Sequence, residues 1–145
     1  MAQIKQADIL ARLIERLHTT SSLTALVPVA SIRNYLPQVN AETAYQGLPY
    51  IRARLDDIDA WDTKKTTGYQ VDATIDCWIG PPNLGDLKAH QIADEVMNAL
   101  QRVPLVLTVG HCILARHLRT NMIAENDGRT IHAVLRFRLL TSETP

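Results

Sequence analysis

Histidine is the side chain in this sequence best suited to bind a metal or to move a proton near neutral pH. Five are present: His18, His90, His111, His117 and His132. His111 and His117 could share one face of a strand, with His132 across from one of them. A zinc site, however, needs three or four ligands that converge at ~2 Å and are oriented by further hydrogen bonds. Because no spacing here enforces that convergence, we expect solvent-facing histidines. A small metal-binding enzyme is the less favoured alternative.

The aspartates Asp56, Asp57, Asp59 and Asp62 form the second group that could do chemistry. Paired carboxylates serve as acid and base in catalysis, or bind divalent cations. Their spacing matches no calcium-binding loop, and the sequence has no glycine-rich phosphate loop after a strand and no Ser, Cys or Thr nucleophile motif. The sequence therefore predicts no catalytic residue, no bound metal and no cofactor.

Arginines occur in pairs on three predicted strands. They are Arg52 and Arg54, Arg116 and Arg119, and Arg136 and Arg138. One interpretation is cross-strand pairing on a solvated sheet face, with Asp72, Asp76 or Glu125 as partners. The other is contact with another subunit or with DNA, because the planar guanidinium makes several directed hydrogen bonds at once. Without aromatic side chains between the arginines, a sequence-specific nucleic-acid reader is not favoured.

Trp61 is a large apolar residue inside a polar segment, Asp57 to Gly68. We expect this segment to be an exposed, mobile loop between two strands. Trp61 would then either fold back onto the core or anchor a neighbouring chain, as exposed tryptophans do at interfaces.

Composition excludes several classes of protein. The chain has 145 residues, 46% of them hydrophobic and 21% charged, with a formal net charge of zero. This predicts one folded domain over residues 1–145, large enough to need no disulfide or metal to stabilise it. Zero net charge removes bulk attraction to nucleic acid or anionic membranes. Cys77 and Cys112 lie at apolar strand positions and are expected to be buried thiols. The N-terminal residues do not resemble a signal peptide and no apolar run could span a bilayer, so we expect a cytosolic protein without membrane contact.

Two long runs of alternating side chains flank Asn126-Asp127-Gly128. A period of two is typical of strands with one buried face, and Asp-Gly between two such runs is typical of a tight hairpin. The downstream strand is expected to bury Ile131, Ala133, Leu135, Phe137 and Leu139, and to expose His132, Arg136 and Arg138. The upstream strand is expected to bury Cys112, Leu114, Leu118 and Met122, and to expose His111, His117, Arg119 and Asn121.

The remaining patterns predict two main helices and three further strands. The helices span about Ile4 to His18 and Asp86, as the capping residue, to Gln101, and a short helical turn capped by Ser22 runs through Leu26. The strands span Ser31 to Leu36, Pro49 to Asp57 and Tyr69 to Ile79. Strands in runs with two substantial helices favour the α+β class: a mostly antiparallel sheet with both helices packed on one face and a long C-terminal hairpin.

Several of these segments resemble a known family. They are the stretches 59–64 (Asp-Ala-Trp-Asp-Thr-Lys) and 68–70 (Gly-Tyr-Gln), a helix preceded by the breaker Gly80-Pro81-Pro82, and the stretch from Asp127 to Phe137. Together they are similar to the tail-completion, or tail-terminator, family of tailed bacteriophages and prophages, over nearly the whole chain. The sequence departs from the pattern at Ala133, where glycine is frequent, and from Tyr35 to Leu48.

The resemblance implies a structural virion protein at the head-proximal end of the tail, assembled in the host cytoplasm. Its partners would be copies of itself in a ring, commonly hexameric, the tail-tube protein, and the head–tail connector or stopper, with DNA passing through the lumen. Contact residues would be Trp61, Asp62, Lys64 and Lys65, with Arg52, Arg54, Arg136 and Arg138 on subunit or lumen surfaces. The alternative within this resemblance is a head–tail connector or stopper protein that contacts DNA.

Overall fold

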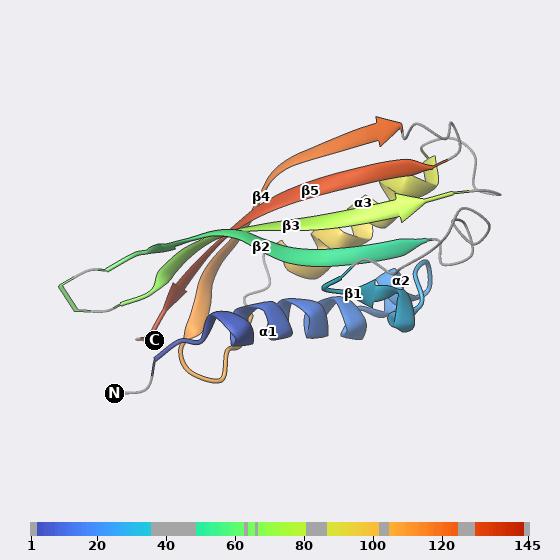
Figure 1. The fold of residues 1–145 in the computed structure, drawn as a ribbon. Helices are drawn as coiled ribbons and strands as arrows, with labels where there is room; N and C mark the ends of the chain where they lie inside the picture. The colour runs from blue at the N-terminus through green and yellow to red at the C-terminus, as the bar shows by residue number, and fades with distance from the viewer. Residues whose placement is uncertain are drawn as a thin grey trace.

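Five strands and three α-helices make up the computed structural model, which describes residues 3–35, 49–62, 64–65, 67–80, 87–101, 105–124 and 130–143. The chain begins with α1 (Gln6–Thr19), α2 (Ser21–Thr24) and a 3-10 turn (Val29–Ser31) before the short strand β1 (Ile32–Arg33). The strands β2 (Tyr50–Ala60) and β3 (Tyr69–Ile79), the helix α3 (Leu87–Leu100) and the strands β4 (His111–Ala124) and β5 (Ile131–Ser142) follow (Figure 1).

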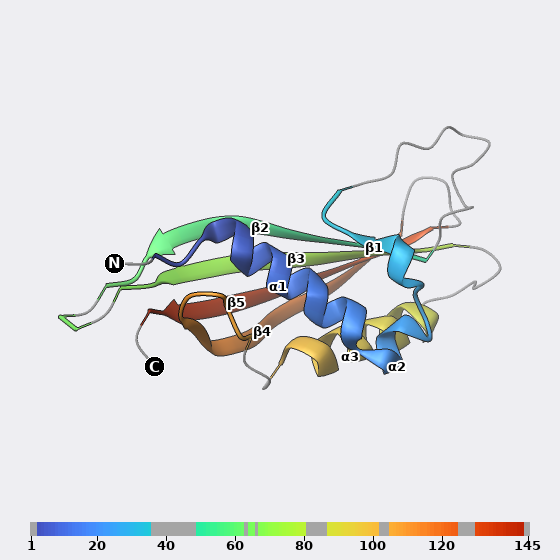
Figure 2. The same ribbon diagram turned by 90° about the horizontal axis from the view of Figure 1, so that it is seen from below.

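The strands form one sheet in the order β1-β2-β3-β5-β4. Every pairing is antiparallel except β1 with β2. The helices lie together on one face of this sheet, and none of the helices that the structure describes lies on the other face (Figure 2). The predicted α+β class, with the main helices on one face and a long C-terminal hairpin, is confirmed.

The core fills the space between sheet and helices. The alternation in β3 and β5 and the helical periodicity in α1 and α3 both direct apolar side chains into this layer. The largest fully buried side chains are Phe137, Ile9, Leu13, Leu17, Leu23, Ile32, Ile51, Ile75, Ile79, Ile92, Leu100 and Leu135. The predicted buried face of the final strand is confirmed for Ala133, Leu135, Phe137 and Leu139, with Ile131 partly buried against the core.

The predicted faces of β4 are wrong at three positions, Leu114, Leu118 and His117, and agree with the register at Cys112, Met122, His111, Arg119 and Asn121. Register shifts between Cys112 and Leu114, and between His117 and Arg119, interrupt its pairing with β5. A bulge adds one residue to one strand, so the side chains beyond it change faces. Leu114 and Leu118 are consequently 42% and 40% exposed. His117, expected to point away, pairs with the buried Phe137 instead.

The predicted loop from Asp57 to Gly68 is shorter than expected. β2 continues to Ala60, and its pairing with β3 extends from Asp57↔Asp72 to Ala60↔Tyr69 beyond a bulge at Leu55/Asp57. Only residues 61–68 connect the two strands. The predicted strand from Ser31 is also shorter, because only Ile32 and Arg33 pair with β2.

Other predictions differ at element ends or cannot be compared. Thr20, not Ser22, occupies the N-cap of α2, and it makes no side-chain capping bond. The Asn126-Asp127-Gly128 turn, the Asp86 cap, Leu36 and Glu125 lie outside the described residues.

Candidate interaction surface

The helix-free face of the sheet, called here the outer face, carries most of the predicted site residues. Its side chains alternate with the buried ones along each strand and align in rows across β2, β3, β5 and β4. The rows, read from the register, are Tyr50–Trp78–His132–Ile123, Arg52–Asp76–Val134–Asn121, Arg54–Thr74–Arg136–Arg119, Asp57–Asp72–Arg138–Arg116 and Asp59–Gln70–Leu140–Leu114. Arg52, Arg54, Arg136 and Arg138 therefore lie on one surface.

Asp76 is the centre of a charged cluster on the outer face. Its Oδ2 accepts hydrogen bonds from Arg52 Nη2 at 3.0 Å and from Arg54 Nε at 3.0 Å, and its Oδ1 lies 2.9 Å from His132 Nε2. Arg54 also pairs with Asp56, whose other oxygen accepts a hydrogen bond from Thr74. The Asp76 carboxylate is 0% exposed, so this part of the outer face is buried and not solvated as we expected.

The surroundings of Asp76 determine its charge. Burial alone would raise the pKa of this carboxyl, but hydrogen bonds from His132, Arg54 and Arg52 favour its ionised form more strongly. The net result lowers the pKa of Asp76 from 3.8 to about 2. Asp76 is thus an ionised anchor that fixes the guanidinium groups of Arg52 and Arg54.

Trp78 completes the cluster and was not singled out by the sequence patterns. Its ring stacks on His132 with centroids 4.5 Å apart, and Arg52 lies 5.5 Å from the Trp78 ring centroid. Cation–π and stacking contacts of this kind hold the ring and the guanidinium in fixed orientations. The sequence did contain a sign of this role, because Trp78 falls on the polar face of its strand, two residues after Asp76.

The two halves of the outer face differ in how their charges are paired. Arg138 Nε donates to Asp72 Oδ1 at 3.0 Å, which confirms cross-strand pairing there. That hydrogen bond raises the pKa of Arg138. Among the residues that the structure describes, no carboxylate pairs with Arg116, Arg119 or Arg136, and all three are exposed. Among the described residues, the β4–β5 half of the outer face therefore carries an excess of positive charge.

The hairpin that joins β2 to β3 projects beyond α1 (Figures 1 and 2). Trp61 N donates to Gly68 O at 2.8 Å, which continues the strand pairing by one step, and the Trp61 side chain is partly buried. The end of β5 holds the base of the hairpin, because Tyr69 N donates to Thr141 Oγ1 at 2.9 Å. A β-carbon on Gly68 would lie 1.9 Å from Thr141 O, so only glycine fits there.

Beyond this base, the hairpin presents charged side chains to solvent. Asp62, Lys64 and Lys65 are all exposed. The structure thus brings the predicted contact residues of the hairpin together but sets them apart from the arginines of the outer face, which belong to the middle of the strands.

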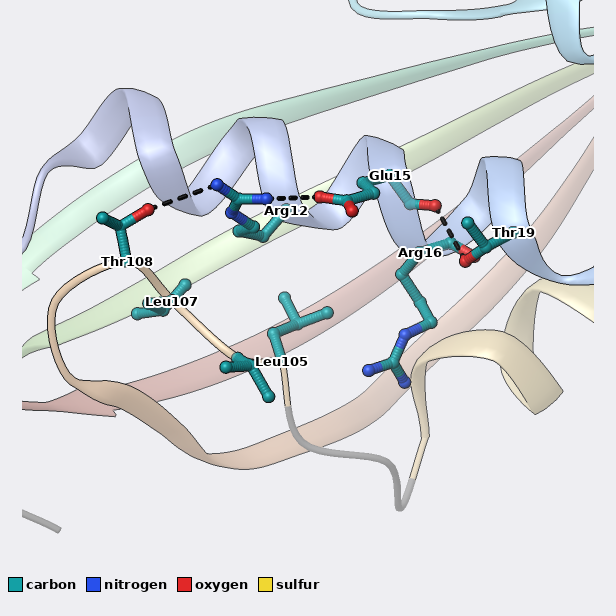
Figure 3. A pocket seen from close by; sticks show the side chains of 8 residues that line it. Arg12, Glu15, Arg16, Thr19, Leu105, Leu107 and Thr108 are labelled. Carbon is teal, nitrogen blue, oxygen red and sulfur yellow. Dashed lines mark hydrogen bonds and ion pairs between the residues drawn. The ribbon is translucent and has the colours of Figure 1, made fainter.

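A cleft of about 390 Å³ lies between α1 and residues 105–108 (Figure 3). Arg12 crosses it, 2.5 Å from Glu15 and 3.2 Å from Thr108 Oγ1. Asp8 accepts a hydrogen bond from Thr108 N at 2.7 Å, which holds the pKa of Asp8 below its ordinary value even though burial acts to raise it. These contacts attach residues 105–108 to α1, and we interpret the cleft as a packing seam.

The histidines occupy separate surroundings. His18 Nε2 lies 2.8 Å from Ile32 O, His117 contacts the Phe137 ring at 5.4 Å on the core side, and His132 binds Asp76 on the outer face. The expectation of solvent-facing histidines is wrong for these three. Over the described part of the chain, no three His, Cys, Asp or Glu side chains are placed to share a metal ion. Cys77 and Cys112 are free, buried thiols whose pKa burial raises.

Comparison with known protein families shows which family this chain belongs to. The family model described as Tail completion protein gp17 matches residues 11–142, which include most of α1, all of α3 and the whole sheet. The chain belongs to the tail completion protein gp17 family. It is therefore a structural protein of the virion tail, as the resemblance in its sequence implied.

A solved structure supports the fold of this tail completion protein. A chain from "Virion of native gene transfer agent (GTA) particle" superimposes with a TM-score of 0.78 at 20% sequence identity, covering 94% of this chain and 96% of the other. No curated protein sequence matches the tail completion protein. In the described residues, none of its helices has the length and apolar character to cross a membrane.

Proposed function

We propose that this tail completion protein assembles into a closed homo-oligomeric ring, a hexamer, at the head-proximal end of the tail. The ring stops tail-tube polymerisation and joins the tail to the head connector. Membership of the tail completion family over residues 11–142 carries this proposal. A ring with the symmetry of a hexameric tube would present one copy of the same contact to each tube subunit.

The outer face supports a role in protein–protein contact. Helices cover the opposite face, so this face of the sheet is the large one left for a partner (Figure 2). Its charged side chains are ordered in advance: Asp76 fixes Arg52 and Arg54, and Asp72 fixes Arg138. Groups already held in place lose less conformational entropy when they meet a partner. We assign Arg52, Arg54, Arg136 and Arg138 to subunit or lumen surfaces.

The β2–β3 hairpin is the second contact element that we propose, through Trp61, Asp62, Lys64 and Lys65. Its base is held by β5, whereas the charged side chains at its end are exposed. A projecting hairpin of this kind reaches a neighbouring subunit or the tube without moving the sheet.

Replacing Trp61 with alanine tests the hairpin. We expect Trp61→Ala to weaken ring or tube association by roughly tenfold to a hundredfold, as loss of an interface tryptophan does, while the thermal midpoint of the subunit falls little. Analytical ultracentrifugation with and without tube subunits measures the association, and circular dichroism measures the thermal midpoint. Ile58→Ala, a partly buried position on β2, is the matched control, since it removes apolar area inside the fold. Equal losses of stability and association in Trp61→Ala would make Trp61 a core residue.

Native mass spectrometry of the purified protein, alone and with tail-tube subunits, tests the ring. We expect a discrete hexamer, or a hexamer that forms once tube ends are present, and tubes whose growth stops when the protein is added. A subunit that stays monomeric with tubes and leaves their growth unchanged would contradict the proposal. Binding to DNA together with no effect on tubes would favour the alternative, a connector or stopper protein.

A further inference from the structure

The sheet has two edges with different charge. Within the described residues, β4 forms one edge and β5 is the one strand that pairs with it, while residues 105–106 lie against its beginning at His111 and Cys112. On the opposite edge, β1 pairs with β2 at Ile51 and Arg52, and within the described residues no strand other than β3 pairs with β2 from Ala53 onward. Figure 1 shows the two edges on opposite sides of the molecule. Unpaired edges are where further chains attach to a sheet.

One row across the outer face connects the two edges. The register aligns Asp57 with Asp72, Asp72 with Arg138, and Arg138 with Arg116. The inner pair of this row is satisfied within the subunit, because Arg138 binds Asp72. Its outer members are exposed at opposite edges, Asp57 on β2 and Arg116 on β4. From the β2 edge to the β4 edge, the charges of this row are thus negative, negative, positive and positive.

The neighbouring rows reinforce this separation of charge. Asp59, also exposed, follows Asp57 on β2 and acts electrostatically on Arg138. At the β4 edge, Arg119 and Arg136 align next to each other. Among the described residues neither has a carboxylate partner; Arg119 donates only to the Asn121 side chain. One edge therefore carries a surplus of carboxylates and the other a surplus of guanidinium groups.

We propose that the occupant of each edge is a second copy of this chain, with the β4 edge of one subunit against the β2 edge of the next. Arg116 of one copy then faces Asp57 of its neighbour, with Arg119 and Asp59 in the rows on either side of this pair. The row of alternating pairs continues in this way from subunit to subunit. This inference rests on the proposed ring and names its interface. The two surfaces differ, so the contact is head-to-tail, the kind that closes into rings.

Apolar side chains on β4 favour a protein neighbour over a nucleic acid. Leu114, Leu118 and Ile123 are 42%, 40% and 45% exposed along the same strand as the arginines. Interfaces combine apolar contact with charged groups that fix partner and orientation. A surface that binds phosphates alone gains nothing from these side chains.

A mixing experiment with two charge-reversed variants tests this interface. Arg116→Glu with Arg119→Glu makes both edges acidic, and Asp57→Arg with Asp59→Arg makes both edges basic. We expect each variant alone to associate roughly a hundredfold more weakly than the wild type, because like charges then face each other across the contact. A 1:1 mixture should regain the wild-type oligomer, with the two variants in equal numbers, since acidic edges then meet basic ones.

The controls are single reversals away from both edges. Asp94→Arg on α3 matches Asp57→Arg in its change of net charge, and Lys5→Glu matches Arg116→Glu; both control residues are exposed. These controls should assemble like the wild type. Circular dichroism establishes that each variant is folded, and recovery in the mixture shows it independently. Association of the wild type should also weaken as salt is raised.

The outcomes separate this inference from the proposed function. If each variant alone forms the wild-type oligomer, or if folded variants fail to assemble when mixed, the edge-to-edge contact is wrong while the ring stands. If the wild type forms no oligomer even with tube subunits, both fail. If Arg116→Glu with Arg119→Glu loses only binding to duplex DNA and still assembles, the β4 edge serves nucleic acid, which overturns the inference.

Discussion

Asp76→Asn is expected to lower the free energy of unfolding by about 3 kcal/mol, the lower end of the range for breaking a buried ion pair. Asparagine keeps the size of the side chain but removes the charge that compensates Arg52, Arg54 and the His132 contact. The carboxylate is 0% exposed, whereas the guanidinium groups of Arg52 and Arg54 keep some access to water, which limits the loss. Urea denaturation of both proteins, followed by circular dichroism, measures the difference.

Asp72→Asn is the matched control for this prediction. Asp72 lies on the same strand and the same face, two rows away, and pairs with a single arginine, Arg138. Its side chain is 31% exposed and that of Arg138 is 41% exposed, so we expect a loss below about 1 kcal/mol. Equal losses in Asp76→Asn and Asp72→Asn would show that burial of the Asp76 cluster contributes nothing.

The pH dependence of stability provides an independent test of Asp76. Its pKa is 3.8 when unperturbed and about 2 in the folded protein. The folded state therefore binds the proton less tightly than the unfolded state, so the stabilisation is fully present above about pH 4. It is lost as the pH falls through about 2. From the two pKa values it amounts to about 2 kcal/mol. The wild type should thus lose this much more stability than Asp76→Asn between pH 6 and pH 2. Parallel pH profiles would contradict the lowered pKa.

The sequence predicted the sheet well where alternation is uninterrupted. In β5, the buried Ala133, Leu135, Phe137 and Leu139 follow strict alternation over seven residues, and the structure agrees. In β4 the same reasoning failed at Leu114, Leu118 and His117, because two bulges interrupt the alternation at and between them. No Gly or Pro marks the interior of β4 (His111–Ala124), so the local sequence gave no sign of these bulges. They arise from pairing with β5, which is a tertiary constraint.

The sequence predicted which residues lie on the candidate surface, but not which contacts they make or how deeply they are buried. Alternation placed Arg52, Arg54 and Asp76 on one face, and cross-strand pairing of arginine with aspartate was one of the two interpretations. That two arginines and a histidine converge on one buried carboxylate depends on the register of β2, β3 and β5, which sequence periodicity does not specify. The same register creates the row from Asp57 to Arg116, so the separation of charge between the edges became visible only in the folded chain.

Phe137→Ala should be among the most destabilising single substitutions in the core, with an expected loss of about 3–5 kcal/mol. Phe137 is the only phenylalanine of the chain, is 0% exposed, and contacts the His117 ring in an edge-on arrangement at 5.4 Å. Removing its ring leaves a cavity between the sheet and the helices and takes away the apolar partner of His117. Urea denaturation measures the loss.

Leu114→Ala, on the partner strand of the same hairpin, distinguishes the observed register from the one that plain alternation predicted. Alternation buries Leu114, and truncation of a buried leucine costs about 2–5 kcal/mol. The bulge instead leaves Leu114 42% exposed, so we expect a loss of about 0.5 kcal/mol or less. Both denaturation experiments are done at a protein concentration at which the two variants have the same oligomeric state, because assembly would add to the apparent stability. A large loss in Leu114→Ala would place this side chain in the core and remove the apolar part of the proposed β4 interface.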